Sequence, residues 1–471
     1  MHNELYNNKD ARDIERYAKK LVGKSLRDIL KEEKIDVKEG NKGGIGQILE
    51  KHYFKLKLNN ESEPDFKEAG VELKSGPYKY IRGNKISAKE RLVLNIIDYM
   101  EEYKKEFKTS SFYKKNSTIL LIEYLYEKYK DRLDYIIGYV QLFQFPEKDL
   151  KIIEGDWNKI VDKIKQGKAH EISEGDTNYL GACTKGSSKD STRKQPFNEI
   201  EAKQRAFSLK SKYMTYVINE YLDKGKNTYD DSIIKNIEEL EDKTFEEIVI
   251  EKINRYKGKN LLELALAFDV NYNPEDKAAT SRVANAMVKN MLGVKGKSIE
   301  EFEKANIKIK TIRLTKSGSL KESMSFPAFK FKEVVEEEWE SSCIREIFLN
   351  TRYLFVIYQY DENGSLVLKN SMFWNMPYND LENEVKDVWE KTRNVINEGI
   401  KIIDVKVNKN GKEIMYNNLP NSTDNRVAHV RPHATKDEKK DTQPNGEEFT
   451  KQCFWLNQSY IKEQIKEIHD I

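Results

Sequence analysis

The chain carries two collinear copies of one pattern, divided near residue 230, and this duplication is the strongest constraint on its fold. Residues Asp65–Ser75 align without a gap on Glu301–Thr311, and Ile45–Phe54 aligns on Val283–Leu292. Matching segments follow in the same order in both halves, which indicates two copies of one supersecondary arrangement. The sequence therefore predicts a first domain at residues 1–225, a polar linker at 226–235 and a second domain of the same fold at 236–471.

In the first copy, a turn is followed by a short stretch that alternates apolar and polar residues, as a half-buried strand does. Val71 and Leu73 are the apolar positions and are expected to face the core. Side chains two residues apart on a strand point the same way, so Glu72 and Lys74 share the opposite face. The preceding turn would bring Asp65 back beside Glu72. The segment thus predicts two carboxylates and one ammonium group at a single point.

This combination of groups suits one particular chemistry. Two hard oxygen ligands fit Mg²⁺, which keeps several waters and shares its shell with substrate phosphate. A lysine beside the metal can stabilise developing negative charge or help to deprotonate an attacking water. The plain alternative is an exposed strand edge with a surface ion pair, because 34% of the residues are charged. Glu50, on the predicted amphipathic helix Ile45–Phe54, is either a third carboxylate of the site or a solvated helix residue.

The second copy keeps the apolar positions of this segment but not its acids. Ile307 and Ile309 replace the two core residues of the strand, whereas Glu72 becomes Lys308 and Glu50 falls opposite Val288. Asp65 becomes Glu301, which is one methylene longer. Two lysines and one carboxylate would repel Mg²⁺ rather than hold it. We therefore expect the second copy to fold like the first and to be catalytically inactive, a contrast that a surface-charge interpretation does not predict.

Composition excludes several other classes of protein. Hydrophobic residues make up 38% of the 471 residues, and no apolar run approaches the roughly 18–20 residues that span a bilayer. The first residues are polar and lack a signal-peptide pattern, so a cytoplasmic protein is expected. Cys183, Cys343 and Cys453 are far apart, which predicts neither a disulfide framework nor a zinc motif. The net charge of +3 excludes a polybasic chain but permits local basic faces.

At several places the chain resembles the MutH family of GATC-specific endonucleases, and especially its long, two-copy type II restriction enzymes. The segments that carry the resemblance are Gly44–Glu50, Asp65–Lys74, Lys89–Ile97, Gly167–Glu171 and Lys203–Ser211. The resemblance covers nearly the whole chain. It implies an α/β fold with two tandem restriction-endonuclease-like (MutH-like) domains, each a mixed sheet flanked by helices. It also implies Mg²⁺-dependent hydrolysis of double-stranded DNA on the 5′ side of G in GATC.

Carried over to this sequence, the catalytic residues of the family fall on Glu50, Asp65, Glu72 and Lys74. Asp65, Glu72 and the Leu73 carbonyl would hold Mg²⁺, with Glu50 reaching the same ion or a second one. The second domain would bind DNA as an allosteric or anchoring module, so a second DNA site and dimerisation on DNA are further expectations. No membrane partner is expected.

The resemblance also assigns residues to DNA recognition. A Tyr-Leu-x-x-Arg-Pro-Lys segment of the family matches Tyr179–Lys185, where the arginine is missing, and Ala428–His433, where arginine and proline are present. Arginine suits the two acceptors of guanine, so the second copy is expected to have kept base reading. The residues predicted to contact DNA are Lys185, Lys203, Arg205, Lys210, His429, Arg431 and His433. The alternative for each basic residue is a solvated surface cation.

Two other functions stay open at this stage. One is a methyl-directed nicking endonuclease of mismatch repair, which uses the same site but is typically half this length. The other, from a different class, is a non-catalytic GATC-binding protein built from two degenerate nuclease folds. The complete Asp65, Glu72 and Lys74 set argues against the second of these.

Overall fold

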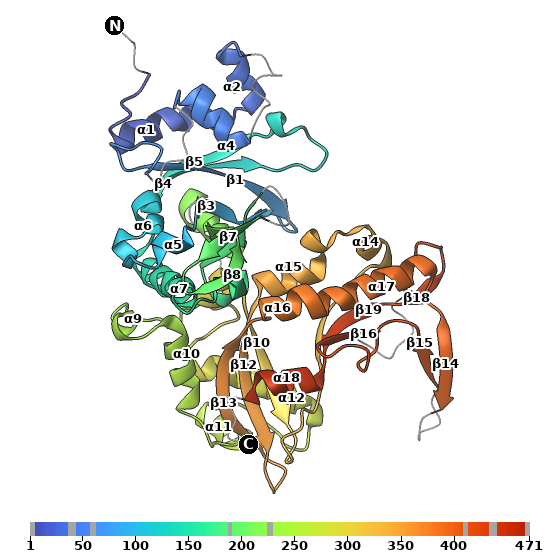
Figure 1. The fold of residues 1–471 in the computed structure, drawn as a ribbon. Helices are drawn as coiled ribbons and strands as arrows, with labels where there is room; N and C mark the ends of the chain where they lie inside the picture. Colours follow the sequence, from blue (N-terminus) through green and yellow to red (C-terminus); the bar gives the residue numbers. More distant parts are fainter. Residues whose placement is uncertain are drawn as a thin grey trace. The chain divides into compact units, whose positions relative to one another are not determined.

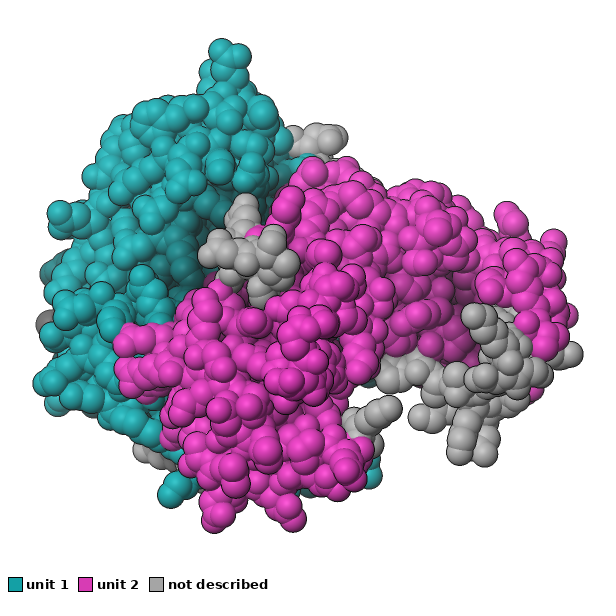
Figure 2. Space-filling model, turned by 90° about the horizontal axis from the view of Figure 1, so that it is seen from below, with its two compact units in different colours: residues 1–248, 294–307 teal, residues 249–293, 308–471 magenta. Residues whose placement is uncertain are grey.

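The computed structural model describes residues 5–35, 44–56, 63–186, 191–223, 229–407, 413–432 and 440–466. The chain forms two compact units, each coloured separately in Figure 2. The first unit comprises Met1–Ile248 and Val294–Ile307, and the second comprises Val249–Gly293 and Lys308–Ile471. Residues 236–248, which the sequence assigned to the second domain, and the segment Val294–Ile307 thus belong to the first compact unit.

The first unit contains helices and strands that follow one another in small groups along the chain. Its helices are α1 (Ala11–Ala18), α2 (Leu26–Glu32), α4 (Ile45–Ile48), α5 (Tyr99–Glu102), α6 (Ser111–Asn116), α7 (Glu147–Lys165), α8 (Ser211–Val217), α9 (Glu239–Asp242) and α13 (Glu300–Ala305). Its strands are β1 (Glu72–Ile81), β2 (Lys85–Ala88), β3 (Leu92–Ile96), β4 (Thr118–Leu125), β5 (Ile137–Gln144), β6 (Leu180–Thr184), β7 (Thr192–Gln195), β8 (Asn198–Lys203) and β9 (Arg205–Leu209).

The strands of the first unit form a mixed sheet in the order β2-β1-β4-β5 and a second sheet in the order β3-β9-β6. β1 runs parallel to β4, whereas β2 and β5 are antiparallel to their neighbours. The expected α/β class with a mixed sheet is therefore confirmed for this unit.

A hydrophobic core lies between this mixed sheet and the N-terminal helices. Figure 1 shows α1, α2 and α4 on one side of the sheet. Ile14, Leu26 and Ile48 from these helices are buried against Leu73 and Leu120, which are directly paired across β1 and β4. Because side chains alternate along a strand, burial of Leu73 on this face turns Glu72 and Lys74 to the opposite face. The core thus fixes the direction of the predicted catalytic side chains.

Two sequence expectations about local structure are corrected. The helical spacing of apolar residues predicts one helix over Asp10–Lys34, but the structure breaks it, because Gly23 takes a φ of +84° and Ser25 starts α2 with a capping box. The sequence of Arg132–Phe145 predicts a pair of strands, but the structure forms one strand there, β5, which follows a 3₁₀ turn at Arg132–Asp134. The helix expected over Ile45–Phe54 is confirmed as α4 followed by a π-helical segment, η2 (Leu49–Tyr53).

The second unit has a strand arrangement like that of the first. Its helices are α11 (Leu261–Ala267), α12 (Lys277–Met291), α14 (Phe331–Glu336), α15 (Cys343–Asn350), α16 (Tyr378–Asp380), α17 (Lys386–Glu398) and α18 (Gln458–Gln464), and the unit boundary falls within α10 (Phe245–Asn254). Its strands are β10 (Ile307–Leu314), β11 (Met324–Ala328), β12 (Arg352–Tyr360), β13 (Leu366–Trp374), β14 (Ile402–Val407), β15 (Glu413–Asn417), β16 (Ala428–Pro432), β17 (Lys440–Thr442), β18 (Glu448–Thr450) and β19 (Gln452–Leu456), with Ile307 counted in the first unit.

Two sheets of the second unit, β10-β12-β13 and β11-β19-β16, follow the same chain order as β1-β4-β5 and β3-β9-β6. Its own core gathers Phe355, Trp374 and Trp389 with residues from β11, β16 and β19. Within the described ranges, the structure contains no helix that is long and apolar enough to cross a membrane.

Candidate active site

The predicted turn and strand bring Asp65 and Glu72 together through the backbone. The carboxylate of Asp65 accepts a hydrogen bond from the N–H of Leu73 at 2.9 Å. The carboxylate of Glu72 accepts one from the N–H of Asp65 at 3.1 Å. The turn is closed by paired backbone bonds between Phe66 and Val71. Both carboxylates are therefore held by the main chain of the segment that carries them.

Two lysines face the Glu72 carboxylate. Lys74 Nζ lies 2.5 Å from Glu72 Oε1, and Lys115 Nζ lies 3.8 Å from the same oxygen. The Glu72 side chain is only 1% exposed, and this burial raises its pKa to about 7 against the opposing effect of Lys74. Burial of a carboxylate without full neutralisation destabilises its charged form. The site is thus poised to accept further positive charge.

Glu50 reaches this cluster from the helical segment η2. Burial raises its pKa, the negative charge of Asp65 raises it further, and Lys74 and Lys115 lower it. These couplings place Glu50 within electrostatic range of all three groups. The structure therefore brings together all four residues that the sequence predicted for catalysis.

Lys115, on α6, is a residue of this site that sequence reasoning missed. It lies in a run of two lysines just before β4, and nothing in a lysine-rich sequence distinguishes that run from a solvated surface. Its side chain is 12% exposed and is directed by the fold onto Glu72. Only the packing of α6 against the sheets reveals this contact.

The donor groups fit a hard divalent cation. In the part of the chain that the structure describes, no three His, Cys, Asp or Glu side chains are arranged closely enough to hold a metal ion as they stand. The oxygen of Glu72 is instead ion-paired with Lys74. Asp65 and Glu72 nevertheless supply the oxygen ligands that such a cation prefers. Burial raises the pKa of Glu72 because its negative charge is only partly neutralised by Lys74, and a bound cation would neutralise that charge.

The aligned positions of the second copy are arranged differently. The Glu301 carboxylate is fully buried and accepts hydrogen bonds from the Ser232 hydroxyl and from the N–H groups of Ile233 and Ile234. Lys308 is exposed on β10, and Val288 is buried on α12. Glu301 therefore binds the backbone of Ser232–Ile234, and with Glu300 it faces Lys148, whose Nζ lies 2.7 Å from Glu300 and 3.6 Å from Glu301.

The DNA-contact residues predicted for the first unit differ in exposure. Lys185 is exposed at the end of β6, and Lys203 is half-buried on β8. Arg205 is 1% exposed and donates to the carbonyl of Ala182 at 2.7 Å. Lys210 is buried and donates to the carbonyl of Thr177. The last two side chains thus hold the strand β6 and the turn before it, and only Lys185 projects fully into solvent.

In the second unit, Arg431 is exposed on β16 and lies 3.9 Å over the ring of Trp455. His429 is buried, and its Nδ1 is 2.6 Å from the side-chain oxygen of Asn457. Burial lowers the pKa of His429, which keeps the ring neutral. His433 lies outside the described residues. Arg431 is therefore the residue of this group that is available to an external partner.

Comparisons with known proteins agree with this geometry. The family model described as DNA mismatch repair enzyme MutH matches residues 54–156, which include Asp65, Glu72, Lys74 and Lys115. The chain is 39% identical over 499 residues to the type II restriction enzyme Sau3AI of Staphylococcus aureus, covering 99% of this chain and 100% of that enzyme. It is 30% identical over 156 residues to the DNA mismatch repair protein MutH of Buchnera aphidicola subsp. Baizongia pistaciae (strain Bp), covering 32% of this chain and 70% of that protein.

The similarity to the restriction enzyme and the match to the MutH family model both include the segment that carries the acidic cluster. The segment that bears Asp65, Glu72 and Lys74 lies inside the family-model match, and the longer similarity extends over both units. The chain therefore belongs to the MutH family of nucleases, and within it to the type II restriction enzymes.

Proposed function

We propose that this protein hydrolyses double-stranded DNA on the 5′ side of G in GATC, with Mg²⁺ as its metal ion. The observation that carries the reaction is the cluster of buried Glu72 with half-buried Asp65 and Lys74, joined by Glu50 and Lys115. The choice of GATC and of Mg²⁺ is supported by the sequence resemblance to the MutH family. Nucleases of this kind generally use a divalent metal.

Asp65, Glu72 and the Leu73 carbonyl would hold the cation, and Glu50, which is electrostatically coupled to Asp65, is the further acid proposed for this site. Bound Mg²⁺ supplies charge stabilisation at the phosphoryl oxygens and a more acidic water. Lys74, as an ammonium group, would orient the attacking water and donate to the negative charge that develops on the phosphoryl oxygens. Lys115, whose Nζ lies 3.8 Å from the Glu72 oxygen that Lys74 also faces, would donate to a neighbouring phosphate oxygen.

For the second half of the chain, we propose a degenerate copy of the nuclease that binds DNA as an effector. The shared strand order and the replacement of Glu72 by Lys308 support this role. Domain limits of 1–225 and 236–471, with a linker at 226–235, follow from the sequence repeat.

One active site per chain cuts one strand in a given pose. Cleavage of both strands of a palindromic site therefore needs two chains on the DNA or two successive nicks. A nicking enzyme of mismatch repair is the second candidate, favoured by the local similarity to MutH over 156 residues. The similarity to a restriction enzyme over 99% of the chain favours cleavage of both strands.

The test is digestion of an unmethylated plasmid with Mg²⁺ by the wild type, Glu72→Gln and Lys308→Gln. We expect discrete GATC-ended fragments from the wild type and from Lys308→Gln, the matched variant at the aligned position of the second copy. Glu72→Gln should lose activity by roughly 10³-fold or more, because it removes a ligand and a charge from the site. Full activity of Glu72→Gln would refute the proposed site, and accumulation of nicked circles alone would favour the mismatch-repair alternative.

A further inference from the structure

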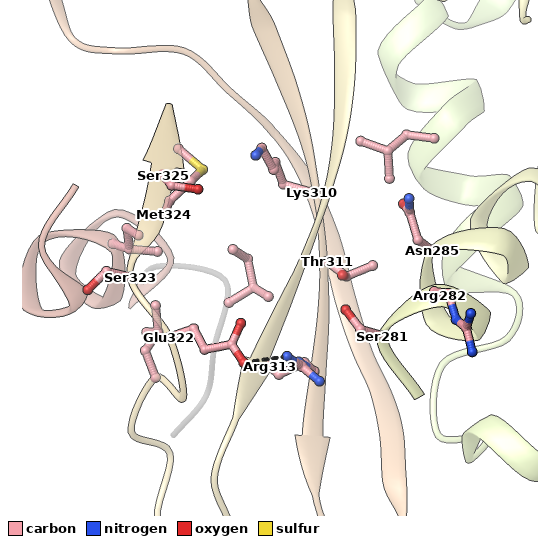
Figure 3. A pocket seen from close by; sticks show the side chains of 14 residues that line it. Ser281, Arg282, Asn285, Lys310, Thr311, Arg313, Glu322, Ser323, Met324 and Ser325 are labelled. Atoms are coloured by element: carbon pink, nitrogen blue, oxygen red, sulfur yellow. Dashed lines mark hydrogen bonds and ion pairs between the residues drawn. The ribbon is translucent and has the colours of Figure 1, made fainter. Parts of the chain in front are cut away.

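The second unit contains a cavity of about 420 Å³ between helix α12, strand β10 and the chain that leads into β11. Figure 3 shows Ser281, Arg282 and Asn285 on the helix side, and Lys310 on the side of β10 that faces Met324 and Ser325. All of the lining residues belong to the second unit. The cavity is therefore a feature of one compact unit and can be considered by itself.

The charges that line this cavity are mostly positive. Lys310, Arg313 and Arg282 are its cations, and Glu322 is the carboxylate among the described lining residues. Arg313 Nη2 donates to Glu322 at 2.6 Å, and the Glu322 side chain is 66% exposed. Water competes for such an exposed acid, so the pair neutralises the cavity only partly.

Lys310 is the least satisfied of the three cations. Within the residues that the structure describes, no carboxylate lies at ion-pair distance from it, and burial alone lowers its pKa. A half-buried ammonium group is stabilised when an anion enters beside it. Hydroxyl groups of Ser281, Thr311 and Ser323 also line the cavity and make its wall more polar.

Lys310 occupies the position in β10 that Lys74 occupies in β1 of the active site. Lys74 is paired with the Glu72 carboxylate, whereas the residue at the Glu72 position of β10 is the exposed Lys308. The second unit has thus kept the lysine that faces a phosphate in a nuclease site and lost the acid that pairs with it. Such a site keeps affinity for phosphate and loses affinity for a divalent cation.

We propose that this cavity binds a phosphate group through Lys310, and that the phosphate belongs to the backbone of duplex DNA. The assignment to DNA rests on the proposed function, in which the second unit is an effector that binds DNA. The phosphate site itself follows from the cavity. Binding there needs no divalent cation, because the lining cations provide the positive charge.

The experiment measures binding of a fluorescently labelled GATC duplex to the full-length chain in EDTA, where metal-dependent cleavage cannot occur. The wild type is compared with Lys310→Gln and with Lys316→Gln, which removes an exposed lysine of the same unit that pairs with Glu362 outside the cavity. Lys310→Gln should bind about tenfold more weakly. The slope of log K against log salt should become shallower by about 0.9 for one lost phosphate contact. Lys316→Gln should match the wild type in both measurements.

Two further arms separate the possible outcomes. Lys310→Arg keeps a cation and should restore the salt slope, which excludes misfolding as the cause. Inorganic phosphate should raise the melting temperature of the wild type and not that of Lys310→Gln. A response to inorganic phosphate without any change in duplex binding would support the phosphate site and overturn its assignment to DNA. If Lys310→Gln equals the wild type toward both probes, the proposal is wrong, whatever the result of the cleavage assay.

Discussion

The backbone N–H of Asp65 donates to the carboxylate of Glu72 at 3.1 Å, across a turn that folds the chain back on itself. The two acids of the proposed site are thus positioned by main-chain geometry rather than by flexible side chains alone. Lys74 approaches the same carboxylate from two residues farther along the strand. Because the two acids are held by backbone hydrogen bonds, Lys74 and Lys115 can be replaced one at a time without displacing Asp65 or Glu72.

Lys74→Met should reduce the rate of DNA cleavage by about 10²-fold or more, because it removes the charge closest to the reacting phosphate. Binding of the GATC duplex in EDTA should change much less than cleavage. The matched variant is Lys79→Met, which removes an exposed lysine from the same strand. Single-turnover cleavage and duplex binding are the measurements, and equal rates for Lys74→Met and Lys79→Met would contradict the role of Lys74.

Lys115→Met should slow cleavage by roughly 10- to 10²-fold, since it removes the second cation that faces Glu72. Lys115 lowers the pKa of Glu72, so its removal should also shift the rising limb of the pH–rate profile to higher pH. Lys114→Met serves as the control, because Lys114 is the exposed neighbour on the same helix. An unchanged pH profile would show that Lys115 does not act on Glu72.

Asp156→Asn should destabilise the first unit by about 3 kcal/mol, since it leaves buried N–H donors without a charged acceptor. Asp156, on α7, is buried and accepts backbone hydrogen bonds from Asn178, Tyr179 and Leu180 at 2.7, 2.6 and 3.0 Å. These bonds anchor the start of the predicted recognition segment, so affinity for GATC should fall more than the rate at saturating DNA. Urea unfolding and cleavage kinetics should show both effects, and the exposed Asp162→Asn on the same helix should show neither.

Because Glu123 is buried, the free energy of unfolding should depend on pH. It is wholly buried on β4, and burial raises its pKa to about 8 from an ordinary value of 4.5. Between those two pKa values the unfolded chain releases a proton that the folded chain keeps. The contribution of Glu123 to the free energy of unfolding is therefore complete below about pH 4.5 and falls as the pH rises to about 8. The expected slope for this group is about −1.4 kcal/mol per pH unit.

Glu123→Gln should therefore be more stable than the wild type at pH 8 and nearly equal to it at pH 5, as measured by urea unfolding. Glu127→Gln removes an exposed acid from the turn after the same strand and should leave the pH dependence unchanged. Parallel pH profiles for the wild type and Glu123→Gln would mean that Glu123 is ionised in the folded protein.

If the second unit is a DNA-binding effector, a plasmid with two GATC sites should be cut faster than a plasmid of equal length with one site. The rate advantage should disappear in Arg431→Ala, because Arg431 is the exposed predicted base-contact residue on β16. Initial rates at equal site concentration are the measurement. Equal rates for the two plasmids would count against an effector role.

Much of the candidate active site was predictable because its parts are local. Asp65, Glu72 and Lys74 lie within one turn and one strand, and the alternation of Val71 and Leu73 already indicates which face each side chain takes. The strand itself proved longer than predicted, since β1 continues to Ile81 by pairing with β2. Residues within a few positions of one another need little tertiary information to be placed together.

The sequence by itself thus determined the repeat, the α/β class and the acids with their neighbouring lysine, because local spacing and alternation encode them. Tertiary structure decided that Lys115 joins the site, that burial raises the pKa of Glu72 to about 7, and that Glu301 instead binds the Ser232–Ile234 backbone. Tertiary packing also buries Arg205, which the sequence analysis predicted to contact DNA. Burial and contacts between distant segments depend on how helices and sheets pack, and no local pattern records that packing.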